Sequence, residues 1–63
     1  MAVREEQVRK LLAAEIAFTY ADNGKPLERA SATLDAARRN SSKEEADAAV
    51  ARYAAMVRRG ELP

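Results

Sequence analysis

The chain has 63 residues, a net charge of +1, and neither cysteine nor histidine. This length allows one domain at most, and the missing residue types exclude a disulfide, a typical structural zinc site and the commonest catalytic side chains. The balanced charge is unlike the basic excess of a typical nucleic-acid-binding module. The sequence shows no run as long as a membrane span and no signal-peptide pattern, so we expect a cytoplasmic protein.

Apolar residues make up 48% of the chain, and half of them are alanine. A chain this small buries a low share of its surface, and alanine adds little to a core. Without a disulfide or a structural metal, association is the remaining way to bury more surface. We therefore expect a homo-oligomer or a small subunit of a larger protein.

The first predicted helix covers residues 3–21. It stops at an Asp-Asn-Gly sequence, because Asn and Gly readily adopt the left-handed conformation that ends helices. Its second half, residues 11–21, is apolar on nearly all sides. Such a helix is usually the central one and has neighbours on more than one side.

Glu15 is the single charged residue of this apolar stretch, and at 100° per residue it lies in the middle of the apolar face. A carboxylate there should be paired, exposed on a rim or turned towards a partner. An arginine of the third helix or of a second subunit would serve as the pair. If Glu15 instead faces a partner protein, the apolar residues around it form a patch that resembles a binding hot spot. Its residues are Leu11, Glu15, Phe18, Thr19 and Tyr20.

The second predicted helix covers residues 26–39. Pro26 suits its first turn and makes Lys25 its boundary, while Arg38 and Arg39 suit the negative end of the helix dipole. Its apolar stripe is narrow and consists of Leu27, Ala30, Leu34 and Ala37.

The spacing of small, aromatic and glycine residues across these two helices resembles that of a tetratricopeptide repeat. They are Ala17, Tyr20, Gly24, Leu27, Ala30, Leu34 and Ala37. The pattern occurs once and departs from the family, because the stretch from Gly24 to Ala30 is one residue too long and no proline closes the repeat. One repeat cannot bury its own face, so the pattern indicates two alanine-rich helices that pack closely. The resemblance implies a protein-interaction role.

The third predicted helix covers residues 43–59. Ser42 with Glu45 forms a capping-box pattern at its start, Ser41 with Glu44 offers the same pattern one residue earlier, and Gly60 follows its end. One side of this helix forms an apolar face. The residues of that face are Ala46, Ala49, Val50, Tyr53, Met56 and Val57. Three such helices with short connections predict an all-α fold, either a small three-helix bundle or helical hairpins that complete a core by self-association.

Function is less constrained. The paired acids Glu5–Glu6 and Glu44–Glu45 lie in first turns, where the helix dipole already explains them, so we expect no enzymatic activity, metal or cofactor. We predict a protein that acts by protein–protein interaction, as a regulator or accessory subunit. The alternative is a small nucleic-acid-binding regulator that uses arginines at helix ends to contact phosphates. Those arginines are Arg38, Arg39, Arg52, Arg58 and Arg59.

Overall fold

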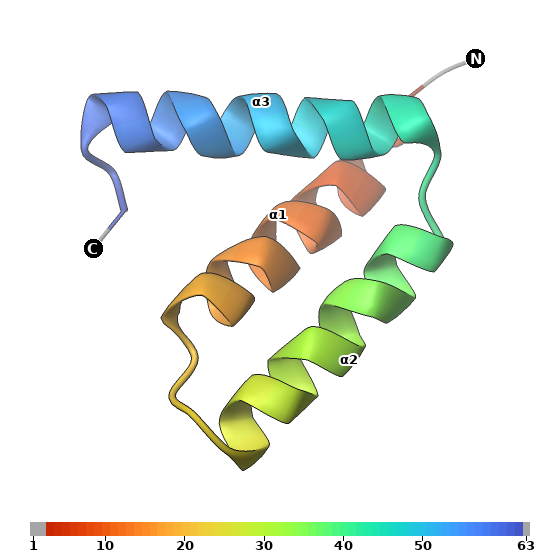
Figure 1. Ribbon diagram of the computed structural model, residues 1–63. Coiled ribbons are helices and arrows are strands. Elements are labelled where there is room, and N and C mark those ends of the chain that lie inside the picture. The colour runs from red at the N-terminus through yellow and green to blue at the C-terminus, as the bar shows by residue number, and fades with distance from the viewer. Residues whose placement is uncertain (1–2, 63) are drawn as a thin grey trace.

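A computed structural model describes residues 3–62 of the chain. Three helices follow one another, α1 (Glu5–Tyr20), α2 (Lys25–Arg39) and α3 (Lys43–Arg59), and this part of the chain contains no strand. α1 and α2 form an antiparallel hairpin, and α3 lies across the end of the hairpin where α1 begins and α2 ends (Figure 1). The prediction of a small all-α three-helix bundle is confirmed.

α1 is the central helix of the bundle, as its apolar second half predicted. Both α2 and α3 pack against α1, whereas α2 and α3 have little contact with each other. Short connections predicted antiparallel neighbours, which holds for α1 and α2 but not for α2 and α3. After the short connection at residues 40–42, α3 packs on α1 through Ala49, which contacts the core of α1, and through the bonds between Glu45 and Arg4.

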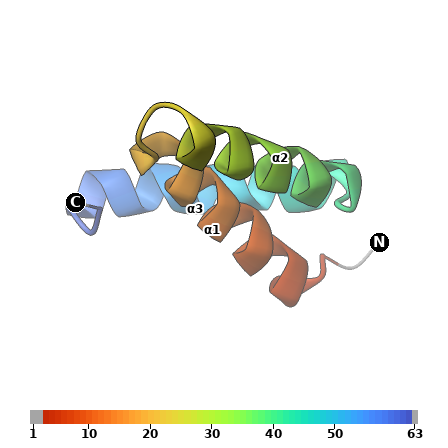
Figure 2. The same ribbon diagram turned by 90° about the horizontal axis from the view of Figure 1, so that it is seen from below.

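The core is shallow. Val8, Leu11 and Ala49 form its fully buried cluster, with alanines of α2 and α3 packed around them, and Ala14 and Leu34 are buried nearby. The molecule is flat, with extents of 38 × 28 × 14 Å (Figure 2). Its accessible surface is 4543 Å², compared with about 4,000 Å² for a typical folded monomer of this mass. The chain therefore leaves more of its surface accessible to solvent than an average protein of this mass does.

The end of α1 differs from the expectation. The chain leaves α1 through Ala21 in an extended conformation, without a left-handed residue at that position. Gly24 does have a positive φ of 93°, but it directly precedes Lys25, the first residue of α2. The prediction that Gly24 terminates the first helix is therefore wrong: its conformational freedom serves the turn into α2.

α3 begins and ends at the predicted residues. The Ser42 hydroxyl accepts the N–H of Glu45 at 3.1 Å, and the Glu45 carboxylate accepts the N–H of Ser42 at 2.8 Å, which completes the capping box. Gly60 adopts the left-handed conformation at the other end. Both are local signals, and both act as the sequence indicated.

The predicted apolar face of α3 is only partly covered. Ala49 is fully buried against α1, whereas Val50 is 57% exposed and Val57 is 54% exposed. The prediction that both valines share the buried side is therefore wrong. α1 and α3 start close together and then diverge, so the last turns of α3 project beyond the hairpin (Figure 1).

Candidate functional site

The most connected polar group of the structure is the carboxylate of Glu45. It accepts three hydrogen bonds from Arg4, namely from the backbone N–H at 2.8 Å, from Nε at 2.8 Å and from Nη2 at 3.0 Å. Arg4 also donates to the backbone oxygen of Asn40 at 2.7 Å. We call Arg4, Asn40, Ser42 and Glu45 the Arg4–Glu45 clamp. It joins the start of α1, the end of α2 and the start of α3.

The clamp has a structural role. Glu45 is only 1% exposed. Hydrogen bonds from the Arg4 side chain, and next from the Ser42 backbone, hold the pKa of Glu45 far below its usual range. A carboxylate that is ionised at neutral pH and accepts four hydrogen bonds has no free lone pair for a substrate and does not act as a proton carrier near neutral pH. Glu45 therefore stabilises the fold.

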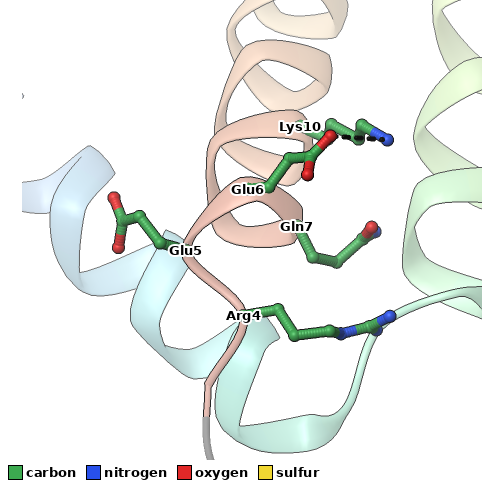
Figure 3. Close-up of a pocket in the computed structure, with 5 residues that line it drawn as sticks. All are labelled: Arg4, Glu5, Glu6, Gln7 and Lys10. Carbon is green, nitrogen blue, oxygen red and sulfur yellow. Dashed lines mark ion pairs between the residues drawn. The ribbon is translucent and has the colours of Figure 1, made fainter.

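A hollow lies beside the first turn of α1, and its polar side chains are bonded to one another or to neighbouring residues. It is lined by Arg4, Glu5, Glu6, Gln7 and Lys10, of which Glu5 points away from the other four (Figure 3). Each has its own partner: Glu5 pairs with Arg52, Glu6 with Lys10, and Gln7 donates to Ala37 and Ser41. These bonds leave no set of polar groups aimed at one point, as a binding site requires.

Glu15 is paired, but with a different helix than expected. Its side chain is 20% exposed, and its Oε1 lies 3.6 Å from Nη2 of Arg38. The predicted arginine partner was one of the third helix or of a second subunit. The structure supplies an arginine of α2 instead, because α2 is the antiparallel neighbour of α1.

The other residues of the hypothetical partner surface divide into two groups. Leu11 is 1% exposed and belongs to the core, so its assignment to a partner surface is wrong. Phe18 is 39% exposed and Tyr20 is 47% exposed. Thr19 lies between them and accepts a hydrogen bond from the Tyr53 hydroxyl at 3.3 Å.

That hydrogen bond links the third aromatic residue of the chain to the last turn of α1, which carries the other two. Phe18, Tyr20 and Tyr53 are the three aromatic residues of the chain, and none belongs to the buried core cluster. Although α1 and α3 diverge, the long Tyr53 side chain of α3 reaches Thr19 near the C-terminal end of α1. We call Phe18, Thr19, Tyr20 and Tyr53 the aromatic end. Tyr53 was not predicted to belong to this surface, because its periodicity places it on the apolar face of α3.

The five arginines of the nucleic-acid hypothesis are dispersed. Arg38 and Arg39 end α2 next to the start of α3, whereas Arg58 and Arg59 lie at the other end of α3. A helix of 17 residues separates these positions, which corresponds to about 25 Å. Three of the five are in ion pairs, Arg38 with Glu15, Arg52 with Glu5 and Arg59 with Glu61. The structure therefore forms no single basic surface from these five residues.

Residues 3–62 contain no group of three or more acidic residues arranged to hold a metal ion. Among them, no helix has the length and apolar character needed to cross a membrane. Comparisons with protein-family models, with curated proteins and with solved structures find no match to this chain.

Proposed function

We propose that this chain is a non-enzymatic protein that acts through protein–protein contact, as a regulator or accessory subunit of a larger protein. The observation that carries the proposal is the aromatic end. Aromatic side chains usually dominate the core of a small domain because they bury the largest apolar area. Here the core cluster consists of aliphatic residues, and two of the three aromatic side chains are more than one third exposed at the C-terminal end of α1.

Exposed aromatic side chains held on rigid helices favour a protein partner. Phe18 and Tyr20 are presented by the last turn of α1, and Tyr53 connects that turn to α3. Large aromatic anchors supply much of the energy of protein interfaces and lose little side-chain entropy when they bind. The ion pair of Glu15 with Arg38 lies one turn earlier on α1 and adds a polar edge. This combination of an apolar centre and a charged edge is typical of an interface.

The large surface of the molecule supports the same proposal. The accessible area exceeds that of a typical monomer of this mass, and Phe18, Tyr20, Val50 and Val57 are among the large apolar side chains left exposed. The partner is a larger protein or a second copy of the chain. A cytoplasmic location is part of the proposal and rests on composition alone.

A site-specific photo-crosslinking experiment tests this proposal. A photoreactive phenylalanine analogue replaces Phe18 in the full chain expressed in its native host, and a matched chain carries the analogue at the exposed Thr33 on α2. We expect one protein to be crosslinked from position 18 and not from position 33. Its affinity for the purified chain should then fall roughly tenfold or more on Phe18→Ala or Tyr20→Ala, and stay unchanged on Thr33→Ala.

Two outcomes would contradict the proposal. One is an affinity for the crosslinked protein that Phe18→Ala and Tyr20→Ala leave unchanged. The other is tight binding of the chain to generic duplex DNA at low salt, with an affinity that falls steeply as salt rises, since that dependence is characteristic of phosphate contacts.

A further inference from the structure

The side of α3 that faces away from α1 carries an unusual set of residues. Asp47, Ala51, Ala54 and Arg58 follow one another at spacings of four, three and four residues, so they form one stripe along the helix. Val50 and Val57 flank this stripe on the same side, and both are more than half exposed. We call these six residues the outer stripe of α3.

Nothing in residues 3–62 covers the outer stripe. Asp47, Ala51 and Arg58 are exposed, and only Ala54 is partly covered. A helix face that points to water normally carries charged and long polar side chains. This one has small and β-branched apolar residues at its centre and charges only near its ends, which is the arrangement of a helix–helix contact.

The order of the charges indicates what covers it. Asp47 lies towards the N-terminal end of the stripe and Arg58 towards its C-terminal end. A second copy of α3, placed antiparallel across a two-fold axis near Ala51 and Ala54, brings each Asp47 opposite an Arg58. The same register places Ala51 opposite Ala54, and it brings Val50 beside Val57 on one flank with an offset of about 3 Å along the helix axis. All three pairings occur twice, as a two-fold interface requires.

From this self-complementarity we infer that the outer stripe is a self-association surface, on which two copies of the chain pair their α3 helices antiparallel. The small side chains at Ala51 and Ala54 let the two helix backbones approach closely. A net charge of +1 gives little repulsion between the copies. The dimer goes beyond the proposed function, because it uses the outer stripe and leaves the aromatic end to another partner.

An antiparallel pair is distinguished from a parallel one by its charges. In a parallel pair each Asp47 would face the other Asp47, and each Arg58 the other Arg58. Replacing Asp47 by arginine would then exchange one like-charge contact for another. In the antiparallel pair the same change places two arginines opposite each other at both symmetric positions, which weakens the dimer.

Sedimentation equilibrium of the full chain, from low micromolar to millimolar concentration, tests the inference with a charge exchange. We expect the unmodified chain to form a dimer in this range. Asp47→Arg alone and Arg58→Asp alone should each raise the dissociation constant roughly tenfold, and the double variant should restore it. The matched control makes the same changes on α2, with Asp35→Arg and Arg29→Asp, and should leave the dimer unaffected.

Circular dichroism confirms that each variant keeps its helical content, because Asp47 also pairs with Lys43 at 3.0 Å in the same helix. A chain that stays monomeric at millimolar concentration overturns the inference. A dimer that is insensitive to both single changes, or one that the double change does not restore, also overturns it. None of these results bears on the aromatic end, whose partner is measured through Phe18 and Tyr20.

Discussion

The two ends of α3 have equally good local signals and very different surroundings. At its start, the capping box is joined by Arg4 from another part of the chain, and Glu45 is almost completely buried. Towards its end, Arg58, Arg59 and Gly60 complete the helix in the expected way, but Val57 is 54% exposed. The comparison teaches that capping and dipole signals define where a helix lies along the chain, and that they do not determine which of its faces is buried.

The largest expected effect comes from a substitution in the Arg4–Glu45 clamp, at the start of α3. Glu45→Gln keeps a side chain that can complete the capping box but removes the negative charge that faces Arg4. We expect the melting temperature to fall by roughly 15 °C, because the buried Glu45 side chain loses its charge-assisted hydrogen bonds from Arg4. Thermal unfolding followed by circular dichroism measures the change.

The neighbouring residue provides the control for this variant. Glu44 lies in the same helical turn and is exposed, so Glu44→Gln should leave the melting temperature nearly unchanged. Equal effects of the two substitutions would show that the clamp adds nothing beyond the helix dipole.

The clamp also predicts sensitivity to acid. The pKa of Glu45 is lowered in the folded state by Arg4, and that of Glu5 is lowered by Arg52. A lowered folded-state pKa gives stability that is fully present above the ordinary glutamate pKa of about 4.3 and is lost as the pH falls below it. The melting temperature should thus be constant near neutral pH and decrease below this value. Glu45→Gln should flatten that decrease, and an unchanged acid profile in this variant would contradict the assignment.

A smaller effect distinguishes the core from the projecting end of α3. Val8 is fully buried and Val57 is more than half exposed. Val8→Ala should destabilise the chain by about 2 kcal/mol, because it removes buried methyl groups and leaves a cavity. Val57→Ala should change the stability by less than about 0.5 kcal/mol when measured at concentrations where the chain is monomeric. Chemical denaturation of both variants makes the comparison, and similar losses would mean that Val57 is buried in solution.

The smallest effect concerns the ion pair between Glu15 on α1 and Arg38 on α2. Glu15 is mostly covered, and its partner Arg38 has a side chain that is 57% exposed, so their ion pair contributes little. Glu15→Leu should raise the melting temperature by a few degrees, because the new side chain adds apolar burial on α1. A decrease of ten degrees or more would indicate that the pair with Arg38 is essential for the hairpin.

Much of the fold was predictable because its signals are local. The break around Ser42, the glycine after Arg59 and the proline at the start of α2 define the helices from a few neighbouring residues each. The central position of α1 also followed from its composition, since a helix that is apolar on nearly all sides needs neighbours on more than one side.

The candidate site was predictable only in part. Phe18 and Tyr20 were recognised as a surface because they cluster in the sequence, but Tyr53 joins them from α3 through its contact with Thr19. The Arg4–Glu45 clamp was not predicted, because its two charged residues are 41 positions apart. Leu11 and Val57 were assigned to the wrong environments for a related reason. Periodicity identifies an apolar face, but it does not show how far a neighbouring helix extends over it.

The sequence by itself determined three helices, their limits to within one or two residues, and a composition that supports only a shallow core. Those properties depend on backbone preferences and on side chains within one or two turns. The tertiary structure alone decided that α3 packs on α1 and diverges from it. It thereby buried Glu45 against Arg4 and left the outer stripe and the aromatic end in water. The physical reason is that helix direction follows from a few contacts between distant residues, and a single sequence carries no local signal for them.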